Sequence, residues 1–472
     1  MLKPTIGCEV HAELNTNSKL FCSCKNEFGG EPNTHCCPVC SGFPGVMPVL
    51  NRKAVELAVK VGLALHCEIN RFSKWDRKNY FYPDLPKAWQ TSQYDLPLCL
   101  GGYVEFTLDG KKKRVRLNRI HLEEDAGKLI HDGGVSRVDY NRCGVPLIEI
   151  VTEPDMNSAE EVVAFLTELK SVLKYTGVSD VKMQEGSMRC DVNLSVAEEG
   201  APLGTRTETK NLNSFRAVAR SIAFEMRRQI DVIESGGTVE QETRRFDDNK
   251  GIGYSMRSKE DAHDYRYFPE PDLLPVVFDD EALRKISDSI PELKDARKAR
   301  YMRELGLPEY DADVLTADKE VSDLFDGVVA LGADGKKASN FIMSEALRLA
   351  KTDGSEDVEL KVSAEQLAAI LKMSAADELN NLAAKQLLSA LWGTDGDAVA
   401  KAKELNLLQS NDAGEIKAVF DKILEQNPSQ TQDFKAGNDK LRGYFVGQVM
   451  RASGGKANPK IINALLDALK GE

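Results

Sequence analysis

The order of apolar and polar residues predicts a β-strand near the start of the chain. From Ile6 to Leu14 the two kinds of residue alternate, and Glu9, His11 and Glu13 occupy the polar positions. Because successive side chains of a strand point to opposite faces, these polar residues share one face and the apolar residues share the other. The segments 188–195 and 205–210 alternate in the same way. The pattern indicates a sheet with one apolar face and one face lined by charged side chains.

Two segments of the first half have the period of an amphipathic helix instead. One covers about Ala159–Tyr175, and Ser158 and Glu161 form a capping box at its start. The other follows Ser214 and ends before Gly236, since glycine commonly ends a helix. Alternating segments surround both helices, which predicts an α+β domain built on a mostly antiparallel sheet.

The pattern changes near residue 280, and helical periodicity rich in Ala, Leu, Lys and Glu follows. In one such helix, Ser363 and Gln366 form a capping box and Leu367 and Leu371 belong to the apolar stripe. We expect a sheet domain over residues 1–290, an all-helical domain over 291–408 and a small helical tail domain over 409–472.

Charge and composition exclude some classes of protein for this chain. The chain has 472 residues and a formal net charge of −12, which argues against a generally basic nucleic-acid coat. Nucleic-acid binding through a local basic patch is still possible, because cationic residues outnumber carboxylates after residue 439. These cations are Lys440, Arg442, Arg451, Lys456, Lys460 and Lys470. No apolar run is long enough for a membrane span and the start has no leader pattern, so we expect a cytoplasmic protein without a membrane contact.

The cysteines are clustered. All ten precede residue 191, and five lie between residues 22 and 40. Cys22, Cys24, Cys37 and Cys40 form a Cys-x-Cys and a Cys-x-x-Cys pair, whose spacing predicts tetrahedral structural zinc. His35 and Cys36 are further donors, so a mixed ligand set stays open. A cluster of reduced, buried thiols is the alternative.

Acidic residues in three places are candidate ligands of a divalent cation, because hard cations prefer oxygen ligands. Glu9 and His11 share the polar face of the first strand, Glu124 follows in an acidic run, and Glu149 lies inside an apolar run. A solvated strand face, a surface loop and an internal ion pair are the respective alternatives.

Two later strands add cations to this chemistry. One puts Arg189, Asp191, Asn193 and Ser195 on one face, and the other does the same for Arg206, Glu208 and Lys210. Carboxylates that hold Mg²⁺ beside cations that neutralise phosphate would suit a nucleotide. Ion-pair ladders across a solvated sheet are the alternative.

The chain lacks the sequence motifs of two kinds of enzyme, P-loop NTPases and glutamine-hydrolysing amidases. It lacks the glycine-rich loop of a P-loop NTPase. It also lacks a nucleophile elbow and an amidase Ser-Ser-Lys pattern, so no residue is a candidate for hydrolysing glutamine.

Long motifs in a fixed order resemble the B subunits of aspartyl/glutamyl-tRNA amidotransferases over essentially the whole chain. They include Gly7–His11, Ser18–Cys22, the block Asp76–Lys87, the segment Lys210–Arg216 and the segment Asp264–Asp272. The resemblance implies a cradle-shaped catalytic domain akin to the glutamine synthetase fold. A helical domain and a small tail domain that contacts tRNA would follow.

The resemblance also implies a reaction. ATP would phosphorylate the side-chain carboxylate of Glu or Asp on a misacylated tRNA, and ammonia would displace phosphate to give Gln-tRNA or Asn-tRNA. A partner A subunit would release the ammonia from glutamine, and a small C subunit would clamp A to B. The chain would thus be a ligase within a heterotrimer.

The implied roles fall on residues already singled out. Glu9, His11, Glu124 and Glu149 match the magnesium positions, and Cys22, Cys24, Cys37 and Cys40 match the zinc positions of some members. Lys78 and Tyr80 belong to a block near the family's ammonia route. We infer from chemistry that Asp191, Asn193, Arg206, Glu208 and Lys210 act with them in catalysis, and that Arg189 and Ser195 bind ATP.

Two other functions compete with this hypothesis. A free-standing ligase would amidate free glutamate without tRNA, and a zinc-containing RNA scaffold would bind tRNA without ATP turnover. The charged strand faces favour an enzyme, and the basic tail favours a tRNA substrate. The choice between Asp-tRNA and Glu-tRNA is left open by the sequence.

Overall fold

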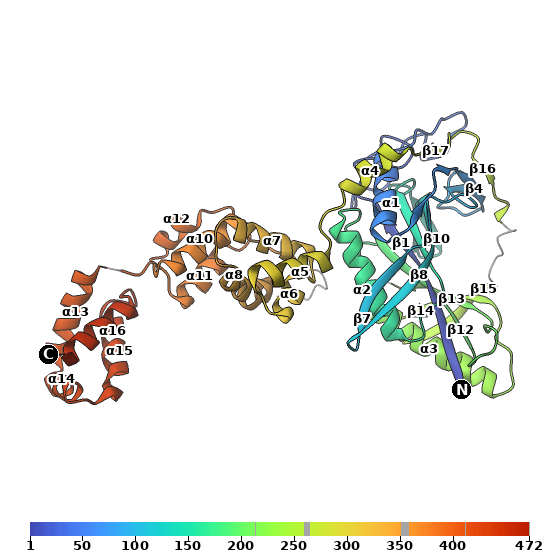
Figure 1. Cartoon of the computed structure of the whole chain (residues 1–472). Helices are drawn as coiled ribbons and strands as arrows, with labels where there is room; N and C mark the ends of the chain where they lie inside the picture. The colour runs from blue at the N-terminus through green and yellow to red at the C-terminus, as the bar shows by residue number, and fades with distance from the viewer. Residues whose placement is uncertain (213, 259–264, 351–357, 411, 472) are drawn as a thin grey trace. The chain divides into compact units, whose positions relative to one another are not determined.

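The computed structural model describes residues 1–212, 214–258, 265–350, 358–410 and 412–471 (Figure 1). Asn213 and Asp264, each part of a motif quoted above, lie outside the described residues. The chain divides into two compact units, Met1–Lys294 and Asp295–Glu472.

A large sheet forms the first unit. Its strands are β1 (Leu2–Glu13), β2 (Glu68–Ile69), β6 (Cys99–Leu100), β7 (Tyr103–Leu108), β8 (Lys111–Glu124), β11 (Pro146–Thr152), β12 (Met188–Glu198), β13 (Thr207–Leu212), β14 (Glu242–Asp247) and β15 (Ile252–Ser258). The order is β15-β14-β13-β12-β1-β11-β8-β6-β2, and β7 pairs with β8. Only the pairing of β13 with β14 is parallel among the described strands of this sheet, so the sheet is mixed with an antiparallel majority. The likeness to glutamine synthetase stays a prediction.

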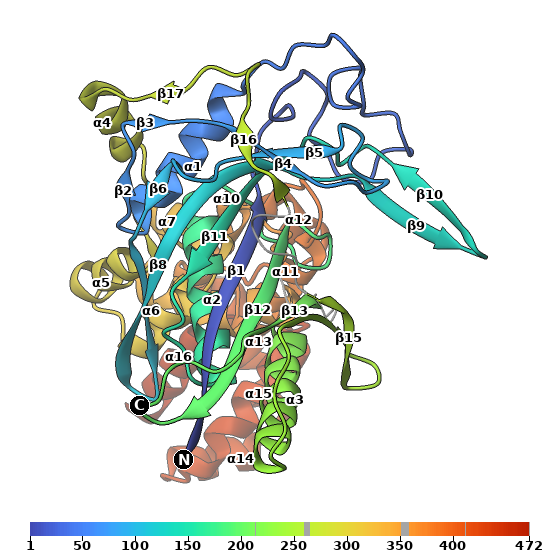
Figure 2. The same cartoon turned by 90° about the vertical axis from the view of Figure 1, so that its right-hand side faces the viewer.

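Short strands make smaller sheets around the large one. They are β3 (Phe72–Ser73) with β17 (Val276–Val277), β4 (Asp76–Asn79) with β5 (Trp89–Ser92) and β16 (Phe268–Pro269), and β9 (Lys128–Asp132) with β10 (Val135–Asp139). The β9–β10 hairpin projects away from the large sheet (Figure 2).

The helices of the first unit are α1 (Arg52–Ala64), α2 (Ala159–Tyr175), α3 (Phe215–Glu234) and α4 (Asp280–Asp288). The bounds of α2 and α3 confirm the sequence prediction, and Ser158 and Ser214 accept the capping hydrogen bonds. The second half of the predicted box differs, because the Glu161 carboxylate accepts from the Asn157 N–H and not from that of Ser158. Helix α1 was not predicted. Its sequence does carry an amphipathic pattern, with Asn51 as cap and Arg52, Lys53, Glu56 and Lys60 as polar positions, and the sequence analysis missed it.

The core lies on one face of the sheet. Ile6, Val10 and Ala12 of β1 are fully buried and belong to one apolar cluster with Phe165 and Leu169 of α2. Figure 2 shows α2 and α3 behind the strands. The other face of β1 carries Glu9 and His11, because side chains alternate along a strand.

The second unit is helical over its described residues. Its helices are α5 (Lys294–Leu305), α6 (Glu309–Thr316), α7 (Lys319–Ala330), α8 (Gly335–Phe341), η2 (Ile342–Ala346), α9 (Leu347–Ala350), α10 (Ala364–Ala375), α11 (Asn381–Leu391), α12 (Ala398–Glu404), α13 (Ala413–Gln426), α14 (Pro428–Lys435), η4 (Asp439–Leu441), α15 (Arg442–Ala452) and α16 (Pro459–Gly471). One hydrophobic core spans Tyr301 to Ala402 and another spans Ile416 to Leu466. The capping box of Ser363 and Gln366 is confirmed. None of the described helices is both long and apolar enough to cross a bilayer.

Candidate active site and metal centre

Three adjacent strands bring one histidine–carboxylate cluster together. The register pairs His11 of β1 with Glu149 of β11, and Glu149 with His121 of β8. Glu123 lies two residues beyond His121 and therefore on the same face. One ligand atom from each of His11, Glu123 and Glu149 lies within 4.8 Å of the others. We call these three residues the first cluster.

Neighbouring charges hold the Glu149 carboxylate of the first cluster in its ionised form. His121 Nε2 lies 3.1 Å from Glu149 Oε2, and both residues of the pair are largely buried. Burial alone would lower the pKa of His121, but Glu149 and Glu123 outweigh it and raise that pKa above its ordinary value. Burial likewise opposes ionisation of Glu149, yet His121 and His11 hold its pKa well below the usual range. The Glu149 carboxylate is therefore available, in its charged form, as a ligand for a cation.

A second cluster consists of Glu9, Asp191 and Glu208, from β1, β12 and β13. One carboxylate oxygen of each lies within 4.8 Å of the others. Asn193 Nδ2 donates to Glu9 Oε1 at 2.9 Å, which fixes that carboxylate. Lys210 Nζ lies 3.1 Å from Asp191 and 3.2 Å from Glu208. Burial opposes the charge of Lys210, but these carboxylates raise its pKa.

Lys78 and Tyr80 lie beside the first cluster. Lys78 Nζ is 4.7 Å from the centre of the Tyr265 ring, a cation–π contact. Burial would lower the pKa of Lys78, but Tyr267, Glu123 and Glu149 outweigh it, so the ammonium stays charged. Burial raises the pKa of Tyr80, which keeps its hydroxyl protonated. The structure thus brings a cation and a phenol close to the carboxylates.

Glu124 does not lie where the sequence analysis expected it. Its carboxylate forms an ion pair with Lys87 and accepts a hydrogen bond from the Thr91 N–H at 2.9 Å. Glu123 lies with His11 and Glu149 in its place. Consecutive residues of a strand face opposite ways, and the acidic run gave no means of choosing between them. The spacing of two from His121 was the available signal.

The remaining candidates are dispersed. Arg189 is paired with the buried Asp125 at 2.7 Å, a partner that the sequence analysis missed. Ser195 is buried further along β12. Arg206 is exposed and precedes β13, so the expected strand face shared with Glu208 and Lys210 begins only at Thr207.

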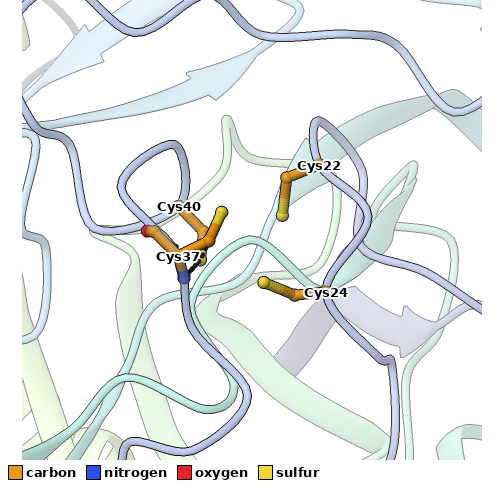
Figure 3. Close-up of side chains that lie close together, drawn as sticks. All are labelled: Cys22, Cys24, Cys37 and Cys40. Atoms are coloured by element: carbon orange, nitrogen blue, oxygen red, sulfur yellow. Dashed lines mark hydrogen bonds between the residues drawn. The ribbon is translucent and has the colours of Figure 1, made fainter.

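The four predicted zinc ligands converge in the structure. The sulfur atoms of Cys22, Cys24, Cys37 and Cys40 all lie within 4.8 Å of one another (Figure 3). The Cys37 N–H donates to Cys40 Sγ at 3.1 Å, and the fully buried Lys19 lies 3.7 Å from the same sulfur. The Cys36 thiol instead donates to the Asn33 carbonyl, and His35 is not part of the group. Four thiols in this arrangement suit structural zinc.

Comparison with known proteins identifies the family. The GatB/GatE catalytic domain model matches residues 4–284, and the GatB domain model matches residues 323–469. The B subunit of the aspartyl/glutamyl-tRNA(Asn/Gln) amidotransferase of Caldicellulosiruptor bescii is 56% identical over 467 residues, which cover 98% of this chain and 97% of the relative. The B subunit from Lachnospira eligens is 53% identical over 474 residues, and the one from Carboxydothermus hydrogenoformans is 48% identical over 467. These matches cover 98% of this chain in both cases, and 98% and 97% of the respective relatives. The protein therefore belongs to the family of aspartyl/glutamyl-tRNA amidotransferase B subunits.

Proposed function

We propose that this chain amidates misacylated Glu-tRNA(Gln), Asp-tRNA(Asn) or both, as a carbon–nitrogen ligase. ATP phosphorylates the side-chain carboxylate of the esterified amino acid, and ammonia then displaces phosphate to give the amide. An A subunit releases this ammonia from glutamine, and a C subunit clamps A to B. Family membership and the printed names of the relatives support this reaction.

The observation that carries the proposal is the pair of carboxylate clusters contributed by neighbouring strands. Glu9 and His11 are two residues apart on β1 and supply one ligand to each cluster. Lys210 contacts the second cluster and Lys78 lies beside the first. Phosphoryl transfer needs negative groups that hold divalent metal and positive groups that neutralise phosphate, and both kinds are present here.

Both clusters offer carboxylate oxygens, the donors that Mg²⁺ prefers, and His11 adds an imidazole nitrogen to the first cluster. His11, Glu123 and Glu149 would form one ligand set, and Glu9, Asp191 and Glu208 the other. Bound Mg²⁺ would offset the charge of the ATP phosphates. Glu123 takes the place of Glu124 in this proposal, because Glu123 lies within ligand distance of His11 and Glu149.

The cations and hydrogen-bond donors have separate tasks. Lys210 would neutralise the transferred phosphoryl group, and Asn193 would keep Glu9 oriented. Lys78 and Tyr80 would position the acyl group and the incoming ammonia beside the first cluster. Arg189, Ser195 and Arg206 lie on or next to the same strands and would contact ATP or the tRNA end.

The direct test is an amidation assay of the complex with the A and C subunits, ATP, glutamine and each misacylated tRNA in turn. We expect Gln-tRNA or Asn-tRNA to form only when ATP is present. If free glutamate is amidated without tRNA, the chain is an ordinary ligase. If tRNA binds but no ATP is consumed, the chain is a scaffold.

Zinc analysis checks the cysteine cluster. A preparation made without chelator should contain about one zinc ion per chain. Cys22→Ser should lose most of this metal, whereas Cys36→Ser should keep it because the Cys36 thiol faces the Asn33 carbonyl. A zinc-free wild type, or equal loss from both variants, would contradict the assignment.

Removal of residues 409–472 tests the proposed tRNA contact of the tail. Arg442, Lys460 and Lys470 each pair with an aspartate, whereas Lys440, Arg451 and Lys456 are exposed cations. Because the tail has a hydrophobic core of its own, a cut after Leu408 should leave the carboxylate clusters intact. We expect weaker tRNA binding and a smaller loss of affinity as salt rises. The same affinity and salt slope as the full chain would refute the contact.

A further inference from the structure

A basic groove on the first unit is lined by residues of α1 and of the β17–α4 segment. Figure 1 shows α1 and α4 next to each other. The volume of the groove is about 490 Å³. Leu57, Val276, Phe278 and Ile286 line it with apolar side chains. Its charged lining residues are Arg52, Lys53, Lys60 and Lys285 against the single acid Glu56. This local excess of positive charge contrasts with the net charge of −12 of the whole chain.

The positive charge of the groove is only partly neutralised. Arg52 pairs with Glu56 at 2.9 Å, and Lys285 pairs with Glu281 at 2.6 Å. Among the residues that the structure describes, no carboxylate lies within ion-pair distance of Lys53 or Lys60. Burial and repulsion from Lys53 also lower the pKa of Lys60. An anionic partner placed between these lysines would relieve that repulsion.

Apolar residues continue from the groove to the surface beside it. Val277 lines the groove and is 70% exposed, and its cross-strand neighbour Phe72 is 51% exposed. Exposed apolar residues that adjoin a groove with a charged rim are typical of protein–protein contacts. An RNA backbone would neutralise the lysines but would leave the apolar floor in contact with water. A symmetric dimer would bring these lysines against their own copies.

We propose that the groove between α1 and α4 binds an acidic, amphipathic segment of another subunit of the amidotransferase. Its carboxylates pair with Lys53 and Lys60, and its apolar side chains cover Leu57, Val276 and Val277. This inference rests on the proposed function, because it takes the chain to be one subunit of a complex. The groove lacks the residues of both carboxylate clusters, so it serves assembly and not the chemistry.

A lysine footprint tests the groove on the intact assembly. The chain is acetylated briefly, alone and in complex with the A and C subunits, and each lysine is quantified by mass spectrometry. We expect assembly to slow the modification of Lys53 and Lys60 about tenfold or more, as for desolvated interface charges. Lys111 and Lys112, on the exposed end of β8, serve as internal controls. Equal modification of Lys53 and Lys60 in both states would overturn the proposal.

Matched variants separate the explanations. The double change Lys53→Glu and Lys60→Glu should weaken binding of the A and C subunits at least about tenfold, most strongly at low salt. Val277→Asp should weaken it with little dependence on salt. The control change Lys111→Glu and Lys112→Glu carries the same charge and should assemble like the wild type. Wild-type assembly of both groove variants would refute the groove.

Two further measurements, of tRNA affinity and of self-association, would show whether the groove binds RNA or a second copy of the chain instead of another subunit. If the groove variants lose tRNA affinity but assemble normally, the groove is an RNA surface. If sedimentation shows that the isolated chain self-associates and the variants abolish this, a second copy is the occupant. Ammonium-dependent amidation by the isolated groove variants should equal that of the wild type. If the wild-type complex with the A and C subunits forms no amide, the proposed function is refuted, and the footprint still reports on the groove.

Discussion

The change Glu149→Gln is expected to lower ATP-dependent phosphorylation of the esterified amino acid about a hundredfold or more. Glu149 lies at the centre of the first cluster, 3.1 Å from His121 Nε2 and 3.9 Å from His11 Nε2. Glutamine keeps the shape of the side chain but removes the charge that a magnesium ligand must supply. The loss should therefore appear in the chemical step and leave the fold intact.

The variant needs a control of the same chemistry on the same part of the sheet. Glu153→Gln is such a control. Glu153 lies just beyond the end of β11 and accepts a hydrogen bond from Asn118 at 2.8 Å. A glutamine can accept the same bond, so this control should keep nearly full activity. Transfer of labelled γ-phosphate to the acyl-tRNA measures the step, and thermal unfolding reports on the fold. Wild-type transfer by a folded Glu149→Gln variant would remove Glu149 from the proposed site.

Purified alone, the chain is expected to release no glutamate from glutamine. Hydrolysis of an amide by a cysteine needs an accessible thiolate beside a base. Cys8, Cys67, Cys99, Cys143 and Cys190 are all buried. Burial raises the pKa of Cys67 to about 12 and that of Cys99 well above its ordinary value. The four clustered thiols are the proposed zinc ligands, and zinc-bound thiolates are poorly placed to attack an amide. The remaining thiol, Cys36, donates to the Asn33 carbonyl, which is not a base that could accept its proton.

The measurement compares glutamate release by the isolated chain and by the full complex, with and without ATP and Glu-tRNA. Amidation by the isolated chain should require free ammonium, and addition of the A and C subunits should restore the use of glutamine. Glutamate release by the chain alone at the rate of the complex would reveal a nucleophile on this chain. That result would contradict the proposal that glutamine hydrolysis belongs to the A subunit and amidation to this chain.

Elements with a strong local pattern could be predicted from the sequence. Ser158, Ser214 and Ser363 cap the helices that their neighbours predicted, and the apolar positions of β1 are buried as the alternation required. Helix α1 has the same kind of local signals, a cap at Asn51 and polar residues at helical spacing, but the sequence analysis did not use them. Helix caps and the alternation of a strand depend on residues that are close in the sequence, so both can be predicted without knowing the tertiary structure.

The cysteine cluster was predictable for a similar reason. Two short motifs named Cys22, Cys24, Cys37 and Cys40, because a tight turn already places each pair close together. The motifs left His35 and Cys36 as further donors. Only the path of the loop turns the Cys36 thiol to the Asn33 carbonyl and leaves four sulfur atoms together.

The carboxylate clusters show what the tertiary structure decided. The sequence supplied Glu9, His11 and Glu149 as candidates, but the choice of Glu123 over Glu124 required knowing that His121 shares a face with them. The strand register settles this choice, because it places His11, Glu149 and His121 side by side although they are far apart in the chain. Register depends on packing of the whole sheet against its helices, and a shift of one residue would turn every side chain to the other face. The sequence by itself therefore determined the residue types and the local secondary structure. Only the assembled sheet decided which charged groups lie next to one another.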